Sequence, residues 1–346
     1  MTPGTKDLIA RNRPGLTVAA GLARGLIQFA VSKGVNQETL LARTGIRLDV
    51  LQDQDSRIPF DNYVTLMRTA KELTNDPALA LHYGEVNDFA DISIVGLITL
   101  AAETMLDAFT QMNRFAGLVI EVDCERDRFR LERDNNIIWL IDTRRNPNDF
   151  LELTESTFTR MVVGGRRIGP ATLIKEVHVT HAAPAYRAEY DRLLQVPVKF
   201  EAKKNAIALD YAWLAVKVAL QPRYTFGILS EHAEKLLKNL QDSKTTRGRV
   251  ESLLMPLLHT GDVSMDKIAE TMAMSRQTLF RKLKDEGTTF EKVLDELRHN
   301  MALHYLGGKK VSINETAYLV GFSEAAAFSR AFKRWTGKSP SEMRKS

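Results

Sequence analysis

The chain has 346 residues, which is long for one hydrophobic core and predicts two domains or three. Its hydrophobic fraction of 44% and charged fraction of 26% are typical of a soluble globular protein, and no apolar segment approaches the roughly 20 residues that span a bilayer. The single cysteine, Cys124, excludes an internal disulfide and a cysteine-rich metal site, and predicts a reducing, cytoplasmic compartment without membrane attachment.

Charge is distributed unevenly along the chain. Residues 245–346 hold 17 Lys and Arg against 12 Asp and Glu, and this difference accounts for the whole net charge of +5. A compact basic segment on a neutral body indicates a polyanionic partner such as nucleic acid. A merely basic surface remains an alternative on charge alone.

The first elements are expected to be helices. Residues 11–34 combine basic and apolar residues like a signal peptide, but Arg24 interrupts the apolar run, and Gln28 and Lys33 follow at helical spacing. We therefore predict an amphipathic helix there. From 36 to 116 apolar residues recur three and four apart, which predicts further helices.

The periodicity changes after residue 116. The segment "GLVIEVDCERDRFRLERDNNIIWLIDTRR" alternates and is broken by Asp-Asn-Asn at 134–136, which predicts two or three antiparallel strands. We expect a helix at 149–167, strands within 175–181 and 196–210, and a helix at 184–194 between those strands. The first two thirds of the chain therefore predict an α+β domain.

A polar helix at 224–240 precedes the cluster "QDSKTTRGR", which marks a domain boundary near 242–248. Everything beyond this boundary reads as helices with short loops. The predicted fold is an α+β N-terminal domain followed by an all-α C-terminal domain with two helix-turn-helix motifs joined by a long helix.

The two motifs appear as an internal repeat with a spacing of about 48 residues. "SMDKIAETMAMSRQTLFRKLKDEG" begins at 264 and "SINETAYLVGFSEAAAFSRAFKRWTG" begins at 312; one residue of slip aligns Arg281 with Arg330. Each copy predicts a helix-turn-helix motif, at 264–285 and 312–335, with Ser275 or Ser323 as N-cap of the second helix. The helix between the motifs is long enough to hold them about one DNA turn apart, roughly 34 Å.

The outward faces of these second helices are suited to DNA. Small side chains allow close approach in the major groove, and arginine pairs with guanine edges. The residues expected at base edges are Gln277, Phe280, Arg281, Ala326, Ser329 and Arg330. The residues expected at phosphates, which position the protein without reading sequence, are Ser275, Arg276, Lys284, Ser323, Lys333 and Arg334.

The segment "AYLVGFSEAAAFSRAFKRWTGKSPSEMR" resembles the signature of the AraC/XylS family of bacterial transcription regulators. Its Gly-Phe-Ser, Phe-Ser-Arg-Ala-Phe-Lys and Gly-x-Ser-Pro elements stand at the family spacing, and the resemblance covers 247–344. Residues 17–220 resemble, less specifically, the α+β effector-binding and dimerisation domain of the branch labelled arabinose-binding-like, a label that need not describe the ligand. The resemblance implies a small-molecule sensor that pairs two chains, and contact with RNA polymerase, usually to activate. The polar helix before the predicted boundary is assigned as a linker helix at 221–246.

Candidates for catalytic, metal or cofactor chemistry are absent from the sequence patterns. His178 and His181 lie three apart in an expected strand and point to opposite faces, without the helix and glutamate of a zinc protease. We therefore assign no catalytic residue, metal ligand or cofactor. The histidines are interpreted as structural.

Two features of the N-terminal domain leave its ligand open. Arg126, Arg128 and Arg130 share one expected strand face, which suits an anionic ligand or, as we favour, a solvated face balanced by neighbouring acids. Large apolar residues suit either an aliphatic ligand pocket or ordinary core packing; they are Phe89, Ile94, Leu97, Met105, Phe109, Met112 and Phe115. No residue is assigned to effector binding.

The leading hypothesis is a sequence-specific DNA-binding transcription regulator, an activator, controlled by an effector of unknown identity. Effector binding would shift the dimer geometry or the contact through residues 240–250. One alternative is a constitutive regulator whose N-terminal domain only dimerises. Another is an enzyme with a DNA-binding appendage and catalysis within 17–220.

Overall fold

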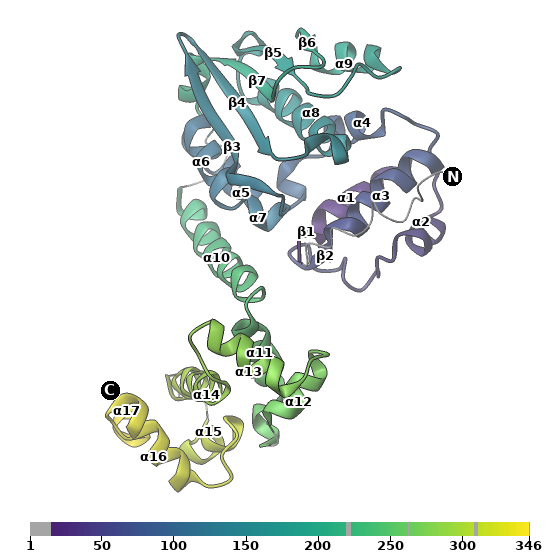
Figure 1. Ribbon diagram of the computed structural model, residues 1–346. Helices are drawn as coiled ribbons and strands as arrows, with labels where there is room; N and C mark the ends of the chain where they lie inside the picture. The colour runs from purple at the N-terminus through teal and green to yellow at the C-terminus, as the bar shows by residue number, and fades with distance from the viewer. Residues whose placement is uncertain (1–14, 219–222, 262, 308–310, 346) are drawn as a thin grey trace. The chain divides into compact units, whose positions relative to one another are not determined.

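The computed structural model describes residues 15–218, 223–261, 263–307 and 311–345 (Figure 1). It divides into two compact units, Met1–Leu237 and Lys238–Ser346. The division falls within helix α10 (Arg223–Asp242), which matches the helix predicted at 224–240. The boundary predicted between 220 and 221 lies outside the described residues.

The N-terminal unit begins with helices around a two-stranded sheet. Strands β1 (Thr17–Ala19) and β2 (Arg57–Pro59) pair antiparallel, and α1 (Ala20–Ser32) buries Leu26 and Ile27 on one face, which confirms the amphipathic helix. The helices expected within 36–116 are present as α2 (Gln37–Thr44), α3 (Phe60–Leu73), α4 (Leu79–Val86), α5 (Ile94–Leu100) and α6 (Met105–Arg114), with the short helices η1 (Phe89–Asp91) and α7 (Ala116–Val119).

The second half of this unit is a five-stranded sheet of order β3-β4-β7-β5-β6. Its strands are β3 (Cys124–Asp134), β4 (Ile137–Arg144), β5 (Ile174–His178), β6 (Val198–Lys199) and β7 (Asn205–Asp210). β3 and β4 form the predicted hairpin, and Asn135 turns it with a φ of 53°, a conformation that asparagine tolerates. β5 and β6 are parallel, whereas the other described pairs of this sheet are antiparallel.

Helix α8 (Leu151–Ile168) lies against this sheet, and α9 (Arg187–Leu194) follows β5 (Figure 1). Phe158 and Val162 of α8 share a buried core with Leu140 and Ile207 of the sheet. On its other side α8 meets α4, where a side chain at Gly84 would come within 2.5 Å of the Ser156 carbonyl oxygen. Because α8 is enclosed by the sheet and α4, even its polar residues are largely buried.

The C-terminal unit is helical throughout its described length. Its helices are α11 (Thr246–Leu254), α12 (Met265–Thr271), α13 (Arg276–Asp285), α14 (Phe290–Gly307), α15 (Ile313–Leu319), α16 (Ala325–Thr336) and α17 (Pro340–Lys345). Val293 of α14 packs with the first motif, whereas Ala302 and Leu306 pack with the second. One helix thus supports both motifs, and the predicted fold is confirmed.

Among the described residues, none of the helices combines the length and apolarity required to cross a membrane.

Candidate DNA-binding surface and ligand pocket

Helix α13 presents the first set of predicted DNA contacts. Ser275 caps it by accepting a hydrogen bond from the Thr278 backbone N–H at 3.1 Å. Leu279 and Leu283, four residues apart, are buried in the core. The opposite face is exposed, and Phe280, although aromatic, is 52% exposed. The exposed face carries Gln277, Phe280, Arg281 and Lys284.

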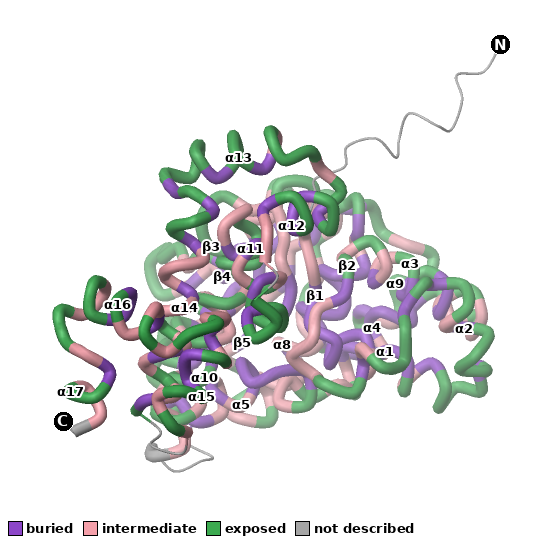
Figure 2. The backbone as a smooth tube through the Cα atoms, turned by 90° about the horizontal axis from the view of Figure 1, so that it is seen from below, coloured by how far each residue is buried: buried purple, intermediate pink, exposed green. Residues whose placement is uncertain are grey.

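Helix α16 presents the second set in the same manner. Phe328 and Phe332 are fully buried. Buried and exposed residues alternate along both α13 and α16, so each helix has one buried and one exposed face (Figure 2). Its remaining face carries the exposed residues Ala326, Arg330, Lys333 and Arg334, with Ser329 half-buried.

The N-cap predicted for this second helix was wrong. α16 is capped by Glu324 rather than Ser323, and the Glu324 side chain makes no capping hydrogen bond. α13 starts directly after Ser275, whereas α16 starts directly after Glu324, the residue that follows Ser323. The one-residue offset between the two repeats therefore lies before the second helix of the motif. Ser323 is exposed in the preceding turn.

Two of the predicted phosphate contacts already have intramolecular partners. Arg276 donates to Asp266 of α12 at 3.1 Å, and Arg334 donates to Asp295 of α14 at 2.9 Å. Both pairs are exposed, so these contacts stabilise little and leave the guanidinium groups accessible.

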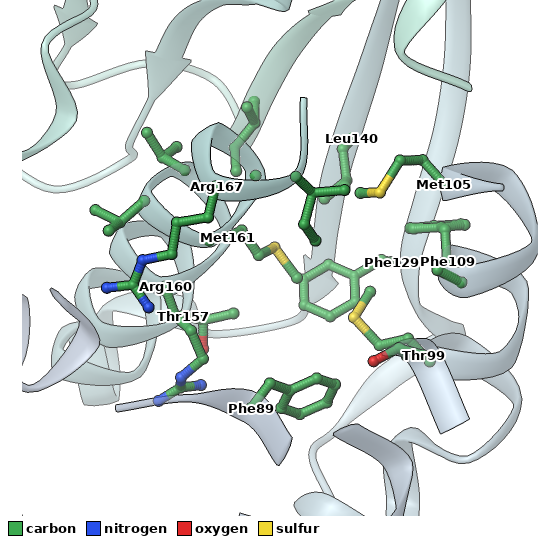
Figure 3. Close-up of a pocket in the computed structure, with 18 of the residues that line it drawn as sticks. Phe89, Thr99, Met105, Phe109, Phe129, Leu140, Thr157, Arg160, Met161 and Arg167 are labelled. Atoms are coloured by element: carbon green, nitrogen blue, oxygen red, sulfur yellow. The ribbon is translucent and has the colours of Figure 1, made fainter. Parts of the chain in front are cut away.

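The N-terminal unit contains a cavity of about 330 Å³ between α8, α6, η1 and the sheet (Figure 3). Four of the apolar residues predicted as pocket candidates line it: Phe89, Met105, Phe109 and Met112. Ile94 and Phe115 are instead buried in the core, and Leu97 does not line the cavity either. Further apolar walls come from Phe129, Leu140 and Met161.

Three arginines also line this cavity. Arg128 is 7% exposed; its Nη2 donates to Thr157 Oγ1 at 3.2 Å, and its buried Nε has no acceptor among the described residues. Nε and Nη2 of Arg160 likewise have no acceptor there. Burial lowers the pKa of Arg128 to about 10, so its guanidinium stays charged at neutral pH. The third, Arg167, is exposed at the rim.

The solvated strand face predicted for Arg126, Arg128 and Arg130 is wrong for the middle residue. The pairing register of β3 with β4 shifts between Cys124 and Phe129, so the alternation of faces is interrupted. Arg128 and Phe129 are consequently both buried although they are adjacent. Arg126 and Arg130 are exposed, and Arg130 pairs with Glu125 and Glu132 as expected.

A second buried polar group lies on the sheet side of α8. Glu155 Oε1 accepts hydrogen bonds from the hydroxyls of Tyr186 and Tyr190, each at 2.8 Å. Burial raises the pKa of Glu155 to about 7. His181 Nε2 lies 3.0 Å from the Tyr190 hydroxyl, a structural role, and no group of three potential metal ligands occurs within the described residues.

Two family models match the chain. One, described as the arabinose-binding domain of AraC transcription regulator, N-terminal, matches residues 34–218. The other, described as a helix-turn-helix domain, matches residues 268–346. The first match alone covers more than half of the chain. The chain belongs to the AraC family.

Individual proteins and a solved structure are also similar to this chain. The ornithine utilization regulator of Pseudomonas aeruginosa is 28% identical over 334 residues, which cover 94% of this chain and 96% of that protein. The transcriptional activator RhaS of Escherichia coli is 37% identical over 112 residues, 32% of this chain and 39% of that one. The crystal structure of the regulator CdpR from Pseudomonas aeruginosa has a TM-score of 0.46 and 19% identity, covering 94% of this chain and 98% of that chain.

This AraC-family chain is therefore a DNA-binding transcription regulator with an arabinose-binding-like N-terminal domain. Its matched domains are those of transcription regulators and not of enzymes.

Proposed function

We propose that this regulator reads a promoter with the exposed faces of α13 and α16, in the cytoplasm and in association with the nucleoid. The observation that carries the proposal is the aligned exposure of Arg281 and Arg330. Each lies on the second helix of its motif, and buried residues of the same helix fix the face on which it stands. Arginine at such a position forms bidentate hydrogen bonds with guanine.

Neighbouring residues divide into two roles. Gln277, Phe280, Ala326 and Ser329 accompany the arginines at base edges, where glutamine suits adenine and Phe280 suits a thymine methyl. The residues assigned to phosphates are Ser275, Arg276, Lys284, Ser323, Lys333 and Arg334. In this assignment Ser323 acts from the turn before α16, and Arg276 and Arg334 exchange their carboxylate partners for phosphates.

A small-molecule effector bound in the 330 Å³ cavity is proposed to control this binding. In this proposal the domains are those predicted from the sequence: an effector and dimerisation domain at 17–220, a linker helix at 221–246 and a DNA-binding domain at 247–344. In the proposed homodimer, the effector shifts the population toward the arrangement whose motifs match their half-sites and contact RNA polymerase to activate. The name of the Pseudomonas relative places ornithine among the effectors to be screened.

Protection footprinting tests the DNA part of this proposal. The full-length protein is titrated onto DNA flanking its own gene, with and without cell extract. We expect a protected direct repeat with two adjacent major-groove contacts per chain, and an extract-dependent change if an effector acts. A constitutive regulator would give the same protection under both conditions.

Single substitutions then test the assigned residues. Arg281→Ala and Arg330→Ala are each expected to weaken binding to the protected site by about 1–3 kcal/mol and to relax preference at one base position. Lys284→Ala should weaken all sequences similarly and flatten the salt dependence. Arg249→Ala, an exposed arginine on α11, is the matched control. Wild-type affinity in both recognition-helix variants would show that these helices do not read the site.

A further inference from the structure

The cavity has two chemically different sides. Its apolar wall includes Met105, Phe109, Phe129 and Leu140, whereas the nitrogen atoms of Arg160 and Arg167 lie on the opposite side (Figure 3). A ligand that fills such a site must combine an apolar body with a polar end.

Two of the arginines that line the cavity, Arg128 and Arg160, carry positive charge without a matching carboxylate. Arg128 and Arg160 form no ion pair among the described residues, and their buried nitrogens noted above have no acceptors. Arg128 donates to Thr157 Oγ1 and lies over the Phe129 ring, 4.8 Å from its centroid, but neither partner is an anion. A buried guanidinium without an anionic partner is costly unless an anion completes the site.

The nearby acids are already engaged. Asp142 is fully buried and accepts from Arg144 Nε at 2.8 Å. Of the two acids that line the cavity, Glu85 pairs with Arg192 at 3.5 Å, and Asp88 is exposed and caps η1 by accepting from the Ala90 N–H. The hydrogen-bond donors without an acceptor are therefore those of Arg128 and Arg160.

The volume limits the size of the ligand. About 330 Å³ lies at the small end of the range for ligand pockets, roughly 300–1,000 Å³. At about 30 Å³ per water-sized group, it holds on the order of ten such groups. A carboxylate with a medium-length hydrocarbon body fits this limit.

We propose that the effector is a medium-chain carboxylic acid, of about eight to ten carbons, whose carboxylate is held by Arg128 and Arg160. Its hydrocarbon body lies against Met105, Phe109 and Phe129. Arginine suits this role because its planar fork of donors matches a carboxylate bidentately. The inference rests on the proposed function, since it takes the cavity as the effector site.

Calorimetric titration of the full-length protein with decanoate tests the ligand class, at concentrations where decanoate is monomeric. Decan-1-ol and decylamine share its chain but lack the anionic head, and acetate has the head without the chain. We expect decanoate to bind at least tenfold more tightly than each of the three. Equal binding of decanoate and decan-1-ol, or no binding of decanoate, would overturn the proposal.

Substitutions test the two arginines separately. Arg128→Gln and Arg160→Gln are each expected to weaken decanoate binding by roughly 10- to 100-fold, the loss of a charge-assisted hydrogen bond, while decan-1-ol binding stays unchanged. Arg126→Gln, on the exposed part of the same strand, is the matched control. Arg160 is less buried than Arg128, so its variant remains informative if Arg128→Gln fails to fold. Wild-type affinity for decanoate in a folded variant rejects that arginine as its ligand.

The two proposals fail separately. A protected DNA site together with no decanoate binding rejects this ligand class but leaves the DNA-binding proposal in place. Decanoate binding that requires Arg128 or Arg160, without any protected DNA site, supports the pocket assignment and rejects the proposed mode of DNA recognition.

Discussion

At the scale of single residues, burial changes what a side chain can do. Glu155 is 1% exposed and is held by two tyrosine hydroxyls, an arrangement that no sequence pattern indicated. Burial disfavours its charged form and raises its pKa from 4.5 to about 7, although the tyrosine hydrogen bonds and Lys71 act in the opposite direction. Glu152, another nearby acid, raises the pKa slightly further.

The shift makes stability depend on pH. The unfolded carboxyl titrates near 4.5 and the folded one near 7, so the folded chain binds more protons between these values. The free energy of unfolding should therefore fall as pH rises from about 5 to 7, by on the order of 3 kcal/mol at most, and this contribution should be constant above that range.

Urea denaturation at several pH values, on wild type and Glu155→Gln, isolates this contribution. Glutamine keeps an oxygen that can accept from Tyr186 and Tyr190, and it does not titrate. The other titratable groups are present in both proteins, so their contributions largely cancel in the difference. We expect the stability difference between the two proteins to change across pH 5–7. A difference that is the same at every pH contradicts the assignment.

At the scale of elements, the two helix-turn-helix motifs contain the same left-handed turn position, but a different residue occupies it in each motif. The turn before α13 contains Ala273 with a φ of 53°, and the turn before α16 contains Gly321 with a φ of 82°. These positions are 48 residues apart, which is the repeat spacing. At Gly321 a side chain would also come within 2.3 Å of the Leu258 carbonyl oxygen, so only glycine fits there.

Gly321→Ala should destabilise the C-terminal unit by about 2 kcal/mol or more. A left-handed conformation costs about 1–2 kcal/mol for a residue with a side chain, and the contact with Leu258 adds to it. Ala273→Gly is the matched control: it removes strain but adds freedom to the unfolded chain, and should stay within about 1 kcal/mol of wild type. Urea denaturation measures both, and similar effects of the two substitutions would contradict this account.

At the scale of the whole molecule, the chain is two units with separate cores. Val250, Leu254 and Leu279 belong to a cluster within the C-terminal unit, and Phe158 and Val177 to one within the N-terminal unit. Because the proposed DNA surface and the cavity lie in different units, each ligand should stabilise one core directly.

Scanning calorimetry of the full-length protein is expected to give two transitions. DNA carrying the protected site should raise only the temperature of the C-terminal transition, and decanoate only that of the N-terminal transition. Each ligand should stabilise its unit by about 2.7 kcal/mol at a ligand concentration of 100 times Kd. Arg281→Ala and Arg128→Gln should each abolish one of these shifts and leave the other. A single transition raised by both ligands would show that the units unfold together.

The sequence by itself determined most of the elements, their order and the exposed faces of α13 and α16, but it did not indicate the short strands β1 and β2. Helix and strand periodicities can be recognised in the sequence, and so can turn residues such as Asn135 in the hairpin. They can be recognised because each depends on residues that are close together in the sequence. The duplicated motif placed Arg281 and Arg330 on exposed faces because the buried positions four apart define the rest of each helix. The prediction of Ser323 as N-cap was wrong because the one-residue offset between the two repeats can be placed before or after the start of the second helix.

Only the tertiary structure decided the contents of the pocket. Arg128 lines the cavity because the register of β3 shifts, and Arg160 lines it because α8 packs against the sheet. Glu155 met Tyr186, Tyr190 and His181 only when α8 packed beside β5 and α9. These contacts join segments distant in sequence, and their energies depend on burial, which no local pattern of residues encodes.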